Sequence, residues 1–82
     1  MNARYWMSLR SRRVVDHWQP CNARTLGGAK AEATRKINYA YGADCPQIGE
    51  NFETNFAIVA WKPGRRWLAV HPDQREYISH PY

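Results

Sequence analysis

The segment that decides the fold is TLGGAKAEATRKINYAYG, residues 25–42. Its apolar side chains recur at spacings of three and four, which is typical of one buried helical face: Leu26, Ala29, Ala33, Ile37 and Ala40. Thr25 precedes them as a good N-cap, and Gly42 stands where a left-handed glycine commonly ends a helix. The pattern predicts one helix between these two residues, whose small side chains allow the covering element to approach closely.

The other side of this helix is polar. Glu32 and Lys36 are four residues apart, the spacing at which opposite charges pair on a helix surface. Gly27 and Gly28 each destabilise a helix by roughly 1 kcal/mol relative to Ala, so the first turn is expected to be its weakest part.

Two strands are expected before the helix. In residues 5–10, YWMSLR, apolar and polar positions alternate as they do in a half-buried strand. Residues 11–13, SRR, form a charged turn, and residues 14–18, VVDHW, give a second β-branched and aromatic run. Pro20 suits an edge strand or a bulge better than a central strand.

The clearest β pattern follows the helix. FAIVAW at residues 56–61 and RWLAV at residues 66–70 flank KPGR at 62–65. Because Pro followed by Gly is a favoured central pair of a turn, these segments are expected to form a hairpin. Residues 43–55 are polar and predict at most a short strand near 47–50.

The resulting element order is β-β-α-(β)-β-β. A single helix cannot bury its apolar face alone, so the economical arrangement is an α+β fold in which one antiparallel sheet of four to five strands wraps around the helix. The 82 residues are expected to form one domain, 1–82, with irregular segments at residues 1–3 and 72–82.

Charge is distributed unevenly along the chain. The net charge is +5, yet residues 1–42 hold eight Lys and Arg against two acidic residues, whereas residues 43–82 hold four against five. Nine of the twelve bases are Arg, whose planar fork matches phosphate and carboxylate groups. This basic half predicts an acidic partner, either nucleic acid or an acidic protein surface. No signal peptide or membrane-spanning apolar run is visible, so a cytoplasmic protein is expected.

No pattern of catalytic residues is recognisable. A nucleophile elbow, a phosphate-binding glycine loop and paired catalytic carboxylates are all lacking, so the chain is expected to be no enzyme and to need no cofactor. The residues that could ligate zinc come from four separate elements: His17, Cys21, Cys45 and His71. They lack the closely spaced ligand pairs of structural zinc sites, so no metal is expected and the two cysteines are interpreted as reduced thiols.

The hairpin turn is the first candidate binding site. Lys62, Arg65 and Arg66 surround it, and Trp61 and Trp67 stand directly behind them. Like charges concentrated at one turn repel each other, so these bases are interpreted as partner contacts. The two tryptophans are expected to belong to the core.

Arg10, Arg12 and Arg13 form a second basic cluster at the first turn and are interpreted as possible nucleic-acid contacts. The two turns would combine into one patch if they lay at the same end of the sheet, which the sequence leaves open.

Two segments resemble parts of a known family. TLGGAK at residues 25–30, followed by Ala33 and Arg35, and WKPGRRW at residues 61–67 look like the helix and last hairpin of small phage-encoded type I-F anti-CRISPR proteins. That family has five antiparallel strands around one helix. Its members bind the crRNA-guided surveillance complex along its backbone subunits, block target DNA hybridisation and promote non-specific duplex binding.

The resemblance implies that Lys62 and Arg66 contact a multisubunit Cas surveillance complex, and that Lys30 and Arg35 form a basic face near DNA. It implies an inhibitor in the host bacterial cytoplasm, acting as a monomer or weak dimer. Mimicry of DNA is not expected of a basic chain. This sequence departs from the family in the proline of its hairpin turn and in Ala31 and Glu32, which follow Lys30 where the family continues with a basic residue.

Two other function classes remain open. A small basic nucleic-acid-binding module of phage or bacterial origin would place Arg on phosphates and an exposed aromatic ring on a base. A phage assembly protein would self-associate through a sheet edge.

Overall fold

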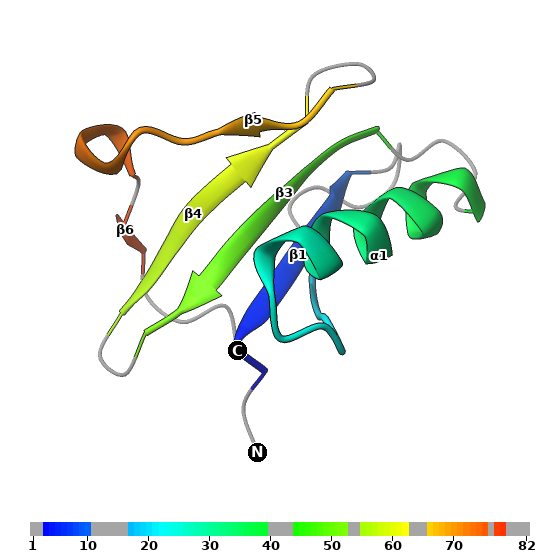
Figure 1. The fold of residues 1–82 in the computed structure, drawn as a ribbon, viewed down its shortest axis with the longest axis horizontal. Coiled ribbons are helices and arrows are strands. Elements are labelled where there is room, and N and C mark those ends of the chain that lie inside the picture. The colour runs from blue at the N-terminus through cyan, green and yellow to red at the C-terminus, as the bar shows by residue number, and fades with distance from the viewer. Residues whose placement is uncertain are drawn as a thin grey trace.

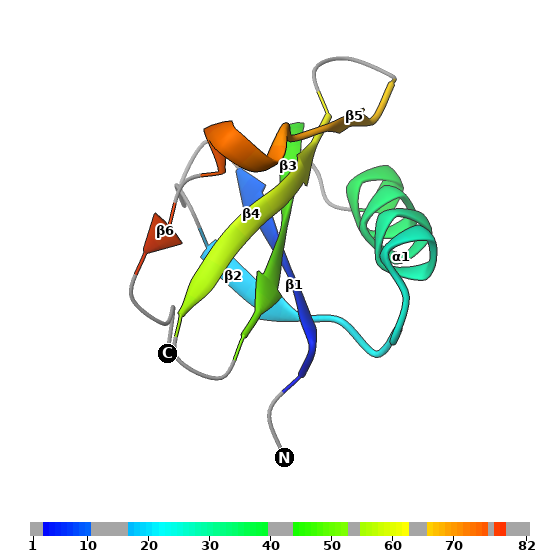
Figure 2. The same cartoon turned by 60° about the vertical axis from the view of Figure 1, so that its left-hand side comes forward.

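The computed structural model describes residues 3–10, 17–39, 44–52, 55–62, 66–75 and 77–78. The elements run in the order β1 (Tyr5–Arg10), β2 (His17–Pro20), α1 (Leu26–Tyr39), β3 (Asp44–Asn51), β4 (Phe56–Trp61), β5 (Leu68–Ala69), the 3-10 turn η1 (Pro72–Gln74) and β6 (Tyr77–Ile78). The strand pairs are antiparallel and α1 lies on one face of the sheet (Figures 1 and 2). The α+β prediction is confirmed.

The sheet has the strand order β2-β1-β3-β4-β5. Strand β5 pairs with the end of β4 at Ala60 and Trp61, and β6 pairs with its beginning at Phe56 and Ala57, so both short strands share one edge of β4. The expectation that residues 72–82 are irregular is therefore wrong for η1 and β6. Pro20 lies in edge strand β2, as its missing N–H group predicts.

Strand β3 is longer and more important than its sequence indicates. A short strand was expected near residues 47–50, but β3 has eight residues and pairs with both β1 and β4. The central place of β3 in the sheet was not predicted because most of its residues are polar. Among the residues of β3 whose burial is described, only Pro46, Ile48 and Gly49 are buried. Pro46 falls where the register with β1 is irregular, the kind of position at which a sheet tolerates proline.

The helix begins where the sequence predicts. The Thr25 hydroxyl accepts a hydrogen bond from the Gly28 N–H at 3.1 Å, and Ala29 and Ala33 are completely buried. A Cβ atom on Gly28 would lie 2.9 Å from the Cβ of Ala23, so this glycine allows the preceding loop to pass close to the helix. The predicted C-terminal glycine, Gly42, lies outside the described residues.

Glu32 does not form the predicted pair with Lys36. Its carboxylate turns to the loop before the helix and accepts hydrogen bonds from the backbone N–H groups of Asn22 at 3.0 Å and Ala23 at 3.2 Å. Unpaired backbone donors bind a carboxylate more firmly than an exposed lysine does, because that lysine is already well hydrated. Lys36 is left exposed to solvent.

Both faces of the sheet are packed. On the helix side, Tyr5, Met7 and Ile48 belong to the buried cluster that α1 covers. On the other side, Phe56 is completely buried and its ring meets that of Trp18 edge-on, with centroids 4.9 Å apart. No helix of the described segments is long and apolar enough to cross a membrane.

Candidate basic interface

The strand directions bring the basic segments to one end of the sheet. Strands β1 and β4 both run antiparallel to β3, so their last residues, Arg10 and Trp61, lie at the same end. The helix also ends there, close to the beginning of β3 (Figures 1 and 2). The end of β1 and the end of β4 therefore share one end of the sheet, while residues 11–16 and 63–65 lie outside the described residues.

A hydrogen-bonded junction attaches the hairpin to the helix. The Trp67 indole Nε1–H donates to the Thr34 hydroxyl oxygen at 3.1 Å, and the Lys62 ammonium donates to the same oxygen at 3.4 Å. Thr34 in turn donates to the backbone carbonyl of Lys30 at 2.9 Å. The Lys62 ammonium also lies 5.6 Å from the centre of the Trp67 ring, a cation–π distance. These contacts fix the helix and the hairpin relative to each other.

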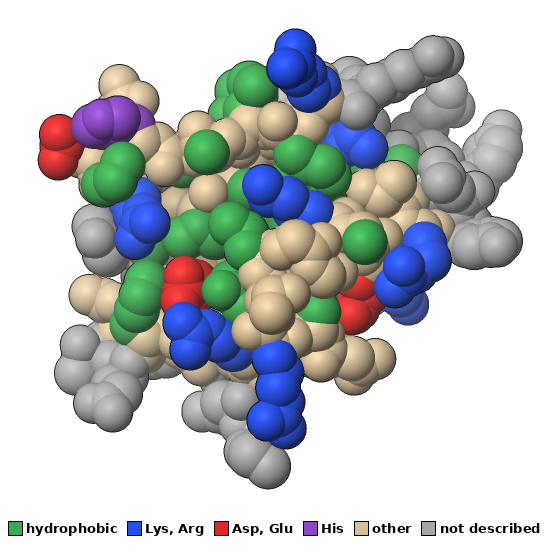
Figure 3. Space-filling view, in the orientation of Figure 1, with side chains coloured by type: hydrophobic (Ala, Val, Ile, Leu, Met, Phe, Trp, Pro, Cys, Tyr) green, Lys and Arg blue, Asp and Glu red, His purple; other side chains and the backbone are tan. Residues whose placement is uncertain are grey.

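The basic side chains of these two elements form what we call the basic surface, which consists of Lys30, Arg35, Lys36, Lys62 and Arg66. Arg35, Lys36 and Arg66 are exposed, whereas Lys30 and Lys62 are half-buried. Glu32, the acidic side chain of the helix, is occupied by backbone donors. Figure 3 shows Lys and Arg spread over the face that the helix covers, with few acidic side chains among them. The surface can therefore attract an anionic partner.

The predicted contacts lie in different environments, and some of them are not described. Arg35 and Arg66 are exposed, Lys30 is half-buried, and Lys62 is half-buried in the junction with Thr34 and Trp67. Of Arg10 only the backbone is described. Arg12, Arg13 and Arg65 lie outside the described residues.

Lys36 and Thr34 belong to the candidate site and were not predicted from the sequence. Lys36 was assigned to an ion pair with Glu32 that the structure does not contain, and its position next to Arg35 was the available signal. Thr34 carried no signal, because its role depends on a hairpin that lies about 30 residues further along the chain.

The two tryptophans of the hairpin have different environments, although both were expected in the core. Trp67 packs against the buried cluster beneath α1. Trp61 is 41% exposed, so the prediction for this residue is wrong. Its side chain shares a sheet face with its cross-strand partner Gln47, which is the face opposite the helix.

Two of the four residues considered for zinc lie at opposite edges of the sheet. Cys21 follows β2 and His71 follows β5, so three strands separate them, and each step across the sheet is about 4.8 Å. Only the backbone of His17 and Cys45 is described. Within the described residues, no group of three His, Cys, Asp or Glu side chains could hold a metal ion.

Thr34→Val should destabilise the fold, because it keeps the shape of the side chain and removes the hydroxyl. The half-buried Trp67 N–H group would lose its acceptor, which should lower the free energy of unfolding by about 1–3 kcal/mol. Urea unfolding followed by circular dichroism measures this change. Thr34→Ser, which retains the hydroxyl, is the matched control. If both variants are as stable as the parent chain, the junction does not stabilise the fold.

Cys21 makes the stability depend on pH in the alkaline range. Burial, together with the nearby charge of Glu32, raises the pKa of the Cys21 thiol from 9.0 to about 12. Between these values the unfolded chain loses the thiol proton and the folded chain keeps it, so stability should fall as the pH rises above about 9. The expected loss is roughly 1.4 kcal/mol per pH unit.

Urea unfolding at pH 8 and pH 10.5 tests this dependence. Cys21→Ala is the control, because Tyr and Lys titrate equally in both proteins. The parent chain should lose more stability over this interval than the variant does. Equal losses would show that the thiol ionises similarly in the folded and unfolded states.

The chain was compared with protein-family models, with curated protein sequences and with solved structures, and no match was found.

Proposed function

We propose that this chain is a non-enzymatic binding protein that attaches to nucleic acid through the basic surface. The observation that carries the proposal is the set of bases on α1 and the β4–β5 hairpin, two elements joined at Thr34, together with the Glu32 carboxylate of the helix, which is occupied by backbone N–H groups. Arginine binds phosphate through several parallel N–H groups, and Arg35 and Arg66 are both exposed.

The Thr34 junction supports the same function. A binding surface built from two elements loses less entropy on association when their relative position is already fixed. Here a buried face of alanines holds the helix on the sheet, and Trp67 and Lys62 hold the hairpin on the helix. Charge neutralisation on such a surface releases counterions from the nucleic acid and stabilises the complex.

Fluorescence anisotropy with labelled single-stranded and duplex DNA of mixed sequence tests this function. The chain should bind both at low salt, and the logarithm of the binding constant should fall linearly with the logarithm of the salt concentration. Absence of binding to both DNAs and to RNA at low salt would contradict the proposal.

A narrower candidate is an anti-CRISPR-type inhibitor that binds a crRNA-guided surveillance complex and interferes with target DNA recognition in the bacterial cytoplasm. The specific observation in its favour is that the two segments similar to that family contact each other. Lys62 and Trp67 from the second segment hydrogen-bond to Thr34, which lies between Ala33 and Arg35 of the first. The two segments thus contribute to one surface.

Affinity capture distinguishes the two candidates. The tagged chain is incubated with lysate of a CRISPR-bearing bacterium, with and without nuclease, and bound proteins are identified by mass spectrometry. A discrete Cas complex that survives nuclease treatment would support the inhibitor. Capture that disappears with nuclease would support direct nucleic-acid binding and would contradict the inhibitor.

A further inference from the structure

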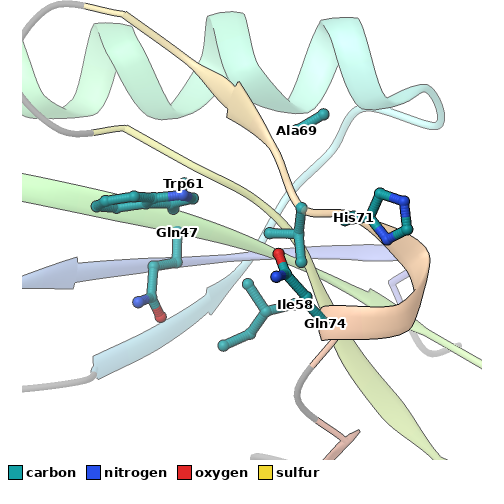
Figure 4. A pocket seen from close by; sticks show the side chains of 7 residues that line it. Gln47, Ile58, Trp61, Ala69, His71 and Gln74 are labelled. Atoms are coloured by element: carbon teal, nitrogen blue, oxygen red, sulfur yellow. The ribbon is translucent and has the colours of Figure 1, made fainter.

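A pocket of about 280 Å³ opens beside the end of β4 (Figure 4). Trp61 and Gln47 line one part of it, and Val70, His71 and Gln74 line the part formed by the chain after β5. Ile58 contributes apolar surface between them. The volume is below the usual range of sites for drug-sized ligands, so it suits a single small ring system.

Trp61 differs from the other tryptophans of the chain. Trp6 donates its indole N–H to the Ala3 carbonyl, Trp18 packs edge-on against an aromatic ring, and Trp67 donates to Thr34. Trp61 is 41% exposed, and it has neither a ring contact nor a side-chain hydrogen bond within the described part of the chain. Its ring therefore offers an unused aromatic surface to a ligand.

The polar groups of the pocket are also unused. The side-chain amides of Gln47 and Gln74 have no hydrogen-bond partner among the described residues, and each offers both a donor and an acceptor. The His71 Nδ1 accepts from the Asp73 N–H at 3.2 Å, which leaves Nε2 as the ring nitrogen available to a ligand. A ligand that satisfies these groups must present donors and acceptors along one edge.

We infer that this pocket binds one base of single-stranded nucleic acid, with the base stacked on Trp61 and its edge hydrogen-bonded to Gln47 or Gln74. A nucleobase combines a flat apolar face with an edge of donors and acceptors, and glutamine amides recognise such edges. Bases inside a duplex are stacked on one another, so only an unpaired base can enter.

The position of the pocket fits this ligand. Trp61 directly precedes Lys62 of the basic surface, and Arg75 directly follows Gln74. A single-stranded nucleic acid whose phosphates contact the hairpin bases can therefore place one of its bases in the pocket, which lies on the opposite face of β4. The inference rests on the proposed function and adds a preference for single strands.

Fluorescence anisotropy with three labelled DNAs tests the inference: a 12-nucleotide single strand, the same strand with abasic sites in place of its bases, and a duplex. Trp61→Ala should weaken binding of the base-containing strand roughly ten-fold and leave the other two unchanged. Trp61→Phe should retain most of the affinity, because a phenyl ring still stacks. Circular dichroism and thermal unfolding establish that each variant is folded.

Two further variants provide a control outside the pocket and a second substitution within it. Leu68→Ala is the matched control, because Leu68 is 40% exposed, pairs with Trp61 across the strands and does not line the pocket. Its binding should equal that of the parent chain. Gln74→Ala, in the exposed η1 turn, should reduce single-strand binding without perturbing the sheet.

The outcomes separate the two proposals. Unchanged single-strand binding by folded Trp61→Ala and Gln74→Ala overturns the pocket assignment and leaves the proposed function intact. Equal losses on the base-containing and abasic strands also overturn it, because the effect would then not involve a base. Failure of the parent chain to bind any of the three DNAs contradicts the proposed function itself.

Discussion

Replacing Arg35 and Arg66 together by Gln is expected to weaken DNA binding on the order of 50-fold at 0.1 M salt. The slope of the logarithm of the binding constant against the logarithm of salt concentration should fall in magnitude by about two, one for each lost phosphate contact. Both side chains are exposed, so the fold should be unaffected. Anisotropy titrations at several salt concentrations measure both quantities.

The matched control removes two charges from the opposite end of the molecule. Arg24 lies two residues before α1, and Arg4 lies immediately before β1, where it pairs with Glu50 at 2.9 Å. Arg4→Gln with Arg24→Gln gives the same net charge as the first variant and should bind nearly as well as the parent chain. If the two double variants lose affinity equally, overall charge rather than the basic surface controls binding.

Gly49→Ala is expected to unfold the chain or leave it barely stable. A Cβ atom at this position would overlap the Phe56 ring, which is completely buried and packed against Trp18. Gly49 also belongs to the central strand β3, so neither the ring nor the backbone can move far. We expect a loss of at least about 3 kcal/mol, which is a large part of the stability of a small domain.

A second substitution tests the cause of this loss. Phe56→Leu removes the outer atoms of the ring, so the double variant Gly49→Ala, Phe56→Leu should be more stable than Gly49→Ala alone. Urea unfolding of the four proteins in this cycle gives the coupling between the two sites. Additive effects would show that the clash with Phe56 is not responsible and that backbone conformation at Gly49 matters instead.

The helix could be predicted because its information is local. The buried alanines Ala29 and Ala33 and the N-cap Thr25 lie within one short segment. The structure confirms the burial of both alanines and the hydrogen bond of the cap. Strand β3 was underestimated for the opposite reason. It is polar in sequence, and it becomes central through pairing with β1 and β4, which a reading of residues 44–51 alone does not reveal.

The candidate site residues also differ in whether local sequence or the fold determines their surroundings. Arg66 was chosen from the charge of the hairpin turn and Arg35 from the resemblance, but the contact between their two elements at Thr34 depends on the fold. The sequence gives Trp61 and Trp67 similar surroundings, and only the pairing of β4 with its neighbours places them on different faces. The pocket beside Trp61 combines residues from β3, β4 and η1, so no local pattern could indicate it.

The topology also determines where other molecules can be attached to this chain. Strand β1 begins, and β6 pairs, at the end of the sheet opposite the hairpin (Figure 1). An affinity handle, a fluorophore or a fused domain attached directly to the beginning of β1 would therefore extend from the end of the described sheet that is farthest from the hairpin. The protein can be immobilised or linked in tandem from that end with the end of β4 and the adjoining Lys62 facing away from the support.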